Sequence, residues 1–181
     1  MVNGKENRVY TLYMYHEIDR RFLVQKMPSL KKITPVIRER HFLQHGDLVE
    51  EWVQKKDGEF EYEIKTAISP REWAREKRSI TEREFKELAR RAPKTILCES
   101  YFLSEHPRIL IKRYKGEFRG LDVAEVEFDT LAESGLFAPL EWMGTEITHL
   151  PLGRDARLLE FDREHFLREL KIEYDKLNGN F

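Results

Sequence analysis

The sequence predicts a mainly β protein of the α+β class, in which antiparallel strands form a barrel and helices lie outside it. Stretches of alternating polar and apolar residues follow one another along most of the chain, and the first of them is rich in Tyr and Val. Short turns separate these stretches, and Asp57-Gly58 is a pair that favours a two-residue hairpin. Helical patterns are few and stand apart from the strands. Many strands in hairpins with few helices between them favour an antiparallel barrel.

The strands are expected to follow in hairpin order. Pro28 and Pro35 bracket the loop after the first and longest strand, and His45-Gly46-Asp47 forms the next turn. Glu105-His106-Pro107 makes the turn of a later hairpin, which precedes the most regularly alternating strand. The predicted strands cover residues 9–24, 36–43, 48–54, 59–65, 73–80, 97–103, 109–114 and 121–128.

Three helices are predicted from their capping residues and apolar faces. Thr81 followed by Glu84 fits a capping box, which opens a helix that runs to about Arg91. A short helix is expected over 130–135. Asp162 can cap a closing helix. The apolar side of that last helix carries Phe166, Leu170 and Leu177.

Composition favours one globular domain over residues 1–181. Hydrophobic residues make up 40% of the chain, which is enough for a core, and 36% are charged. The 32 Lys and Arg nearly balance the 33 Asp and Glu, so the net charge is −1. This balance argues against a nucleic-acid partner and against a disordered tail. It fits a barrel with a charged interior, and a heavily salt-bridged surface would give the same count.

Cys98 is the only cysteine, so no disulfide can form within the chain and a reducing compartment is expected. We interpret Cys98 as a small core residue rather than a nucleophile. No apolar run approaches the length of a membrane span, and the first eight residues are too polar for a signal peptide. We therefore expect a cytoplasmic protein without a membrane partner.

The first strand carries a chemically suggestive pattern. Glu17, Asp19 and Arg21 occupy alternate positions, so on a strand they share one face. Two carboxylates about 7 Å apart can bind a hard divalent cation, and an adjacent arginine can fork onto a phosphate. An ordinary solvated strand face has the same alternation, so this pattern alone leaves both interpretations open.

Four segments in order resemble motifs of the CYTH superfamily, also called the triphosphate tunnel metalloenzymes. The first strand resembles the Glu-x-Glu-x-Lys signature, and Glu63-Ile64-Lys65 resembles a Thr-Ile-Lys strand end. Residues 123–128, Val-Ala-Glu-Val-Glu-Phe, resemble Leu-Ala-Glu-Ile-Glu-Phe. Residues 142–148, Trp-Met-Gly-Thr-Glu-Ile-Thr, resemble Trp-x-Gly-x-Glu-Val-Thr. The resemblance implies an eight-stranded antiparallel barrel that is open as a charged tunnel, with metal-dependent activity on triphosphates.

The resemblance also implies roles for individual residues. The matching cations, which would bind phosphate, are Arg21 and Lys65. Mg²⁺ or Mn²⁺ is expected, because oxygen-only ligands select these ions over zinc and the six His have no metal-binding spacing. The matching carboxylates, which would hold the metal and act in catalysis, are Glu17, Asp19, Glu125 and Glu127. Glu125 and Glu127 as ordinary solvated strand residues remain the alternative.

The chain departs from the family pattern at several tunnel positions. Glu51-Trp52-Val53-Gln54-Lys55 stands where the family has Arg-x-Arg, and Cys98-Glu99-Ser100-Tyr101 stands where it has Lys-x-Arg-Tyr. Basic residues instead occupy positions that are acidic in the family. We predict that these cations, Arg75, Lys77 and Lys112, take over substrate binding, or that they pair internally with Glu59, Glu61 and Glu63.

These two options define two functions. A tunnel that accepts ligand implies a divalent-metal-dependent hydrolase of a triphosphate-containing small molecule, which is inorganic triphosphate, a nucleotide or thiamine triphosphate. A self-neutralised tunnel implies a non-catalytic binder of polyphosphate or nucleotide. Buried ion pairs are costly unless fully satisfied, which slightly favours the ligand-accepting tunnel. The oligomeric state stays open, with a homodimer as one option.

Overall fold

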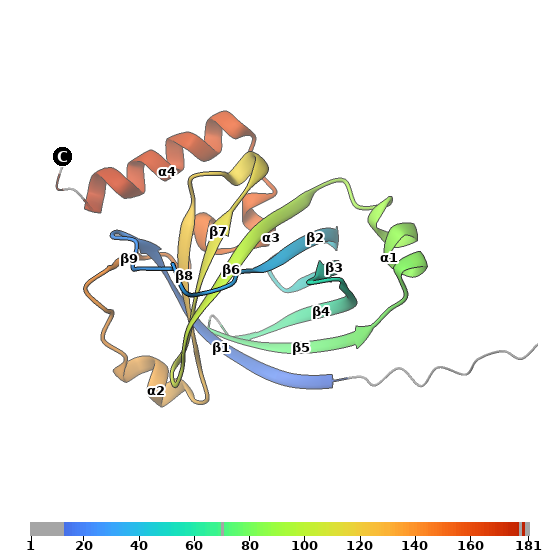
Figure 1. Cartoon of the computed structure of the whole chain (residues 1–181), viewed down its shortest axis with the longest axis horizontal. Coiled ribbons are helices and arrows are strands. Elements are labelled where there is room, and N and C mark those ends of the chain that lie inside the picture. The colour runs from blue at the N-terminus through green and yellow to red at the C-terminus, as the bar shows by residue number, and fades with distance from the viewer. Residues whose placement is uncertain (1–12, 70, 178, 180–181) are drawn as a thin grey trace, which may run out of the picture.

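The main feature of the computed structural model, which describes residues 13–69, 71–177 and 179, is a closed antiparallel barrel (Figure 1). Eight strands pair in the order β1-β5-β4-β3-β2-β6-β7-β8, and β1 closes the ring by pairing with both β5 and β8. These strands are β1 (Tyr13–Val24), β2 (Val36–Gln44), β3 (Val49–Lys56), β4 (Glu59–Ser69), β5 (Glu72–Ser79), β6 (Thr95–Glu105), β7 (Arg108–Tyr114) and β8 (Asp122–Phe128).

Strand β1 is long enough to pair with three neighbours. Its first half pairs with β5, where Glu17 lies opposite Trp73, and its second half pairs with β8, where Arg21 lies opposite Glu125. A ninth strand, β9 (Met143–Glu146), pairs with the end of β1, beyond the residues that β5 covers. The chain thus closes its barrel through the first strand rather than through the last.

The hairpin between β3 and β4 forms at the predicted Asp57-Gly58 turn. Asp57 has φ of 48° and Gly58 has φ of 88°, so both residues lie in the left-handed region that a two-residue hairpin of this hand requires. The turn fixes the register in which Lys56 lies opposite Glu59. That register places Glu61 and Glu63 on the same face as Gln54 of β3.

One end of the barrel is closed by apolar packing. Inward residues of several strands join the largest hydrophobic cluster, which also contains residues of the carboxyl-terminal segment. This segment forms η2 (Pro151–Gly153), α3 (Asp155–Leu158) and α4 (Arg163–Leu177), and η1 (Gly116–Phe118) lies beside α4. A side chain at Gly153 would place its Cβ 1.9 Å from the carbonyl oxygen of Ile147, so this close approach requires glycine. The barrel strands supply Leu23, Phe42, Trp52, Ile96, Cys98, Tyr114 and Val123 to this cluster.

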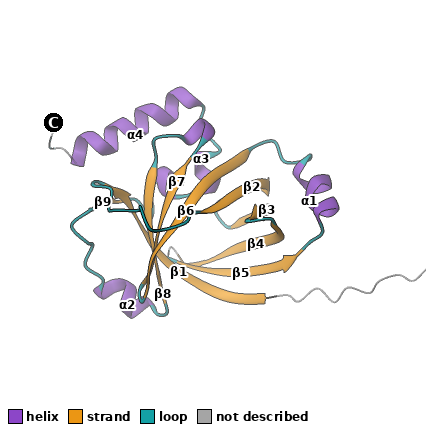
Figure 2. Cartoon of the chain, in the orientation of Figure 1, coloured by secondary structure: helices purple, strands orange, loops and turns teal. Residues whose placement is uncertain are grey.

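Two further helices lie outside the barrel, as Figure 2 shows. Helix α1 (Glu82–Ala89) begins where predicted, because the Thr81 side chain accepts a hydrogen bond from the backbone N–H of Glu84 at 3.1 Å. Its buried Phe85 packs against Phe60 of β4. Helix α2 (Leu131–Leu136) is capped in the same way by Thr130.

The predicted fold class is confirmed, and each predicted strand and helix has its counterpart. Asp162 caps α4 by accepting from the N–H of His165 at 2.7 Å, as expected. The part of the first predicted strand over residues 9–12 lies outside the described residues. Four short elements, η1, β9, η2 and α3, were not predicted, because three or four residues are too few to establish a period. Among the described residues, none of the helices has the length and apolarity needed to cross a membrane.

Candidate active site in the barrel lumen

The candidate site is the charged interior of the barrel, beyond the apolar cluster. Strand parity turns Glu17, Asp19 and Arg21 of β1 inward, as the sequence predicted, and all three are largely buried. In the ring of eight strands, β8 lies beside β1, whereas β2 lies four places away from it in either direction. One wall of the lumen is therefore formed by β1 and β8, and the opposite wall is centred on β2.

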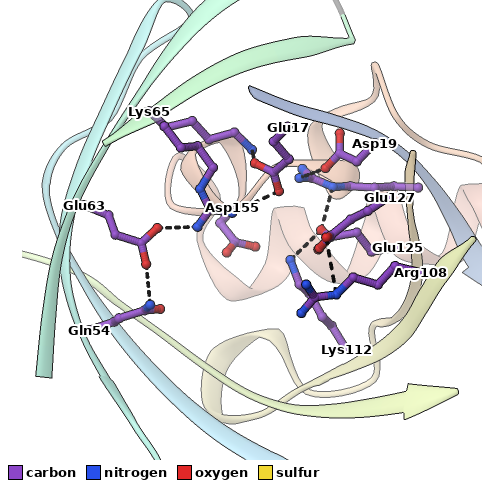
Figure 3. Close-up of polar contacts among 12 residues, drawn as sticks. Glu17, Asp19, Gln54, Glu63, Lys65, Arg108, Lys112, Glu125, Glu127 and Asp155 are labelled. Atoms are coloured by element: carbon purple, nitrogen blue, oxygen red, sulfur yellow. Dashed lines mark hydrogen bonds and ion pairs between the residues drawn. The ribbon is translucent and has the colours of Figure 1, made fainter. Parts of the chain in front are cut away.

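Three acidic side chains converge on the β1–β8 wall (Figure 3). Glu17, Glu125 and Glu127 each offer one carboxylate oxygen within 4.8 Å of the others, which is an arrangement that can hold a metal ion. Glu17 is paired with two cations, because Lys65 Nζ lies 2.8 Å from its Oε2 and Arg75 Nη1 lies 3.2 Å from its Oε1. Asp19, the fourth predicted ligand, lies outside this group because its carboxylate binds the guanidinium of Arg21.

The acids of this wall form two groups, one with lowered and one with raised pKa values, and the charged partners of each acid decide its group. Burial disfavours the charged form of Glu17, but Arg75 and Lys65 outweigh it and hold the pKa well below its usual value. Glu125 likewise has a lowered pKa, because Lys112 and Arg21 outweigh its burial.

Two other acids of the same wall have raised pKa values. Burial, reinforced by the charges of Glu125 and Glu17, raises the pKa of Glu127 to about 6. The pKa of Asp19 is also raised, because burial outweighs its pairing with Arg21. Glu127 is therefore a carboxylate of this lumen that exchanges its proton close to neutral pH.

The predicted substrate-binding cations all have carboxylate partners. Lys65 Nζ lies 2.8 Å from Glu17 Oε2, and Lys112 Nζ donates to Glu125 Oε2 at 2.5 Å. Arg21 Nε donates to the same Glu125 oxygen at 3.0 Å. The lumen therefore carries alternating charges that balance locally. Arg75 binds Glu63 and lies 3.2 Å from Glu17, and Lys77 lies 3.2 Å from Glu61.

Internal pairing of the relocated cations is thus only partly as predicted. Arg75 and Lys77 do pair with Glu63 and Glu61, but Lys112 pairs with Glu125 of the acidic wall instead. Glu59, which was expected to face inward, is exposed at the beginning of β4. Glu59 is the first residue of β4, beside the Asp57-Gly58 turn, and lies opposite Lys56 at the end of the β3–β4 ladder.

Sequence reasoning missed a basic pair on the opposite wall. Arg38 and Arg40 of β2 line the lumen. From the sequence, the Arg-x-Arg motif of the family had been matched to residues 51–55, which lie on the neighbouring strand β3. Arg40 is buried, and its Nη1 donates to Asp155 at 2.7 Å while its Nε donates to Gln54 at 3.0 Å. The signal was available, because two arginines alternate inside a correctly predicted strand. Asp155 lay in an unpredicted helix and gave no such signal.

The lumen is narrow, and wider clefts lie beside it. The space among the charged side chains is about 30 Å³, roughly the volume of one water molecule. A cleft of about 700 Å³ adjoins the acidic wall at Glu17 and Glu127, with Phe128 and Phe137 among its apolar residues. A second cleft of about 420 Å³ reaches Arg21 and Lys65. A chain of phosphates therefore fits into the lumen only if some of the charged side chains that line it move.

Comparison with solved structures shows the same fold in other proteins. Two crystal structures of the protein NE1496, described in one of them as an inorganic triphosphatase, match with TM-scores of 0.60 and 0.58. The first has 21% sequence identity over 81% of this chain and 99% of that chain, and the second has 22% over 78% and 93%. A Bacillus halodurans protein, provisionally assigned as an adenylate cyclase, matches with a TM-score of 0.51 and 11% identity, over 68% of this chain and 86% of that chain.

These likenesses confirm the eight-stranded antiparallel barrel that the resemblance to the CYTH superfamily implied. At this level of identity they establish the fold alone. Neither a family model nor a curated protein sequence matches the chain. The chemistry of the site therefore has to be argued from its own residues.

Proposed function

We propose that this protein is a divalent-metal-dependent hydrolase of triphosphate compounds, built as one domain over residues 1–181. The observation that carries the proposal is the convergence of Glu17, Glu125 and Glu127 inside a closed barrel, beside several buried cations. The fold shared with an inorganic triphosphatase supports it. All donors of the cluster are carboxylate oxygens, so Mg²⁺ or Mn²⁺ is the fitting ion.

A bound divalent ion would neutralise charge on the phosphate and lower the pKa of a bound water molecule. The cationic residues of the chain would then bind the phosphate oxygens. When the carboxylates of Glu17 and Glu125 serve as ligands, their present partners Lys65, Arg75 and Lys112 are left for phosphate oxygens. Cation and anion binding should therefore favour each other, since each removes the counter-charge of the other.

The cleft beside the acidic wall bears on the choice of substrate. Its volume of about 700 Å³ exceeds what a chain of phosphates needs, and Phe128 and Phe137 give it apolar walls. It offers space for an organic group, so nucleoside and thiamine triphosphates belong in the substrate panel together with inorganic triphosphate.

The deciding experiment is phosphate release from this panel with Mg²⁺ or Mn²⁺, for the wild type and Glu125→Gln. We expect metal-dependent release by the wild type and a loss of both activity and Mn²⁺ binding in Glu125→Gln. Glu99→Gln is the matched control, because Glu99 is on the outer face of β6 and pairs with Lys115. Equal activity in wild type and Glu125→Gln would contradict the proposed site.

Lys65→Ala tests the substrate side of the same proposal. Lys65 is buried and pairs only with Glu17 among the described carboxylates. Loss of a charge-assisted contact to phosphate should weaken triphosphate binding by about tenfold or more. Unchanged affinity, measured by calorimetry in the presence of Mn²⁺, would remove Lys65 from the binding site.

A non-catalytic binder is the second candidate function. The observations in its favour are the locally balanced ion pairs and the narrow lumen of about 30 Å³. A binder would show a higher melting temperature with triphosphate but no phosphate release with any divalent ion. If triphosphate changes neither quantity, both functions are wrong and the charged lumen is a structural feature.

A further inference from the structure

The cleft of about 700 Å³ beside the acidic wall has an apolar lining that the barrel does not cover. Residues of β1, the end of β8, the turn between β6 and β7, and α2 form it together. Helix α2 lies at the end of β8 away from α4 (Figure 1). We name this space the mouth cleft. Its size is that of a ligand-binding cleft, and its apolar lining residues are Ile18, Pro107, Phe128, Leu136 and Phe137.

Leu136, at the end of α2, is the most exposed large apolar residue that the structure describes. It is 87% exposed, and it belongs to none of the hydrophobic clusters formed by the described residues. An exposed leucine by itself is ordinary. This one, however, lines the same cleft as Phe128 and Phe137. Apolar surface gathered at a cleft marks a place where another molecule binds.

The mouth cleft also carries an excess of negative charge. Five of its lining residues are acidic, whereas Arg108 is the single Lys or Arg among the described residues that line it. Arg108 itself lies 3.4 Å from Glu127 (Figure 3). The chain as a whole has a net charge of only −1, so this excess is local. Three of the acids are exposed and have no ion-pair partner among the described residues, namely Glu105, Asp129 and Glu133.

The combination of apolar surface and negative charge selects the class of partner. Negative charge repels nucleic acids and anionic lipid surfaces, so neither of these matches the cleft. A positively charged polypeptide with apolar side chains matches both features. Its apolar side chains fill the apolar part of the cleft, and its Lys and Arg side chains face the acids.

We propose that the mouth cleft is a docking surface for a basic, amphipathic segment of a partner protein, whose apolar side chains pack against Leu136 and Phe137. The Lys and Arg side chains of that segment face Glu105 and Asp129. Glu127 of the acidic wall lines the cleft as well, so a bound segment covers this wall from one side. Docking requires neither metal nor triphosphate, and the inference therefore goes beyond the proposed hydrolase.

The experiment measures fluorescence anisotropy of three short labelled peptides, without metal or triphosphate. In the first peptide, Lys or Arg alternates with Leu or Phe. The second has Glu in place of each basic residue, and the third has Ala in place of each apolar residue. We expect the wild type to bind the first peptide, less tightly as salt is added, and the other two about tenfold or more weaker. No binding of the first peptide, or equal binding of all three, would overturn the docking surface.

Variants of the protein test which residues carry the binding. Leu136→Ser should weaken binding of the first peptide by about tenfold or more, because an apolar contact is lost. Glu105→Gln combined with Asp129→Asn should weaken it by about threefold or more, since exposed charge pairs are individually weak. The matched controls are Leu48→Ser, which is 72% exposed but lines the other cleft, and Glu117→Gln on η1. Equal affinity in the cleft variants and the controls would overturn the proposal.

Other occupants of the mouth cleft give different results. If a nucleoside triphosphate with Mn²⁺ loses affinity in Leu136→Ser while the first peptide does not bind at all, the cleft belongs to the substrate and the docking surface is wrong. If spermine binds as tightly as the first peptide, the cleft attracts any cation and the proposal is equally wrong. A wild type that sediments as a dimer, with Leu136→Ser as a monomer, would assign the cleft to a second copy of the chain and overturn the proposal.

The outcomes also separate this inference from the proposed hydrolase. Peptide binding that depends on Leu136, in a protein that releases no phosphate from any triphosphate, would support the docking surface and disprove the hydrolase. Phosphate release without peptide binding would give the reverse conclusion.

Discussion

The two ends of the barrel interior use the same strands for opposite chemistry. On β1, Arg21 lies in the charged lumen, and Leu23, two residues on and on the same face, is in the apolar cluster. On β8, Glu125 and Val123 differ in the same way. Strand parity therefore decides which residues face inward. Whether an inward residue is apolar or charged depends on the elements that pack over it. Where η2, α3 and α4 close the barrel, the inward residues are apolar.

The two ends also differ in what they contribute to stability. Each large side chain buried in the closed end, such as Phe42 or Leu23, contributes about 1.5–3 kcal/mol. In the lumen, the attraction within pairs such as Lys112–Glu125 is offset by the cost of removing both charges from water, so the net gain is small. Stability is therefore concentrated at the closed end, and the lumen is left to ligand chemistry.

The largest expected effect tests this division directly. Phe166 of α4 is fully buried in the closed end, so Phe166→Ala should lower the free energy of unfolding by about 3–5 kcal/mol through lost burial and a cavity. Urea unfolding would measure it, with Leu167→Ala as the control on the exposed side of the same helix. Mn²⁺ affinity of the folded variant should stay as in the wild type. Weaker Mn²⁺ binding would mean that the two ends are coupled.

A smaller loss of stability is expected in the lumen. Glu63 accepts from Gln54 and binds Arg75, so Glu63→Gln keeps the shape but removes a charged partner. We expect a loss of about 1.5–3 kcal/mol in urea unfolding, because Arg75 retains Glu17. Glu87→Gln on the exposed face of α1 is the matched control. A loss as large as that in Phe166→Ala would contradict the contrast between the two ends.

The pH dependence of metal binding is the next expected effect. The pKa of Glu127 is raised to about 6, so its proton competes with a metal ion below that pH. Mn²⁺ affinity should therefore fall as the pH drops through about 6, and Glu127→Gln should show weaker binding that depends less on pH in this range. Calorimetry above and below this pH would measure both. A wild-type affinity that stays constant across pH 6 would exclude Glu127 as a ligand.

The smallest effect is expected on the outer surface. Arg83 and Glu87 pair on α1, with side chains that are 89% and 53% exposed. Arg83→Ala should change the free energy of unfolding by no more than about 0.5 kcal/mol. A change as large as that in Glu63→Gln would mean that exposure does not distinguish outer pairs from those of the lumen.

The sequence was sufficient for the elements with clear periods and turns. Asp57-Gly58 predicted its hairpin, Thr81 its helix, and the alternation around Glu17 its inward face, because each depends on local geometry. The grouping of Glu17 with Glu125 followed only from the resemblance, since more than one hundred residues separate them and no local rule joins β1 to β8.

Other features depend on tertiary contacts and could not be predicted. Asp19 has the same parity as Glu17, but its carboxylate turns to Arg21 of its own strand. Asp155 reaches Arg40 only because α3 closes the barrel at that point. Arg38 was overlooked for a different reason, because the basic pair was sought by alignment to the family rather than by parity along β2.

The closure of the barrel through β1 has a consequence for how the chain folds. Strand β1 is synthesised before the other barrel strands, yet its partner β8 ends at Phe128, so the ring cannot close until all eight strands have left the ribosome. Strands β2, β3, β4 and β5 can pair earlier, because each pairs with the strand that follows it in the sequence. Contacts of such large sequence separation slow folding, to the millisecond-to-second range in all-β domains. Until β8 arrives, the edge of β1 that β8 covers in the finished barrel stays open to pairing with another chain.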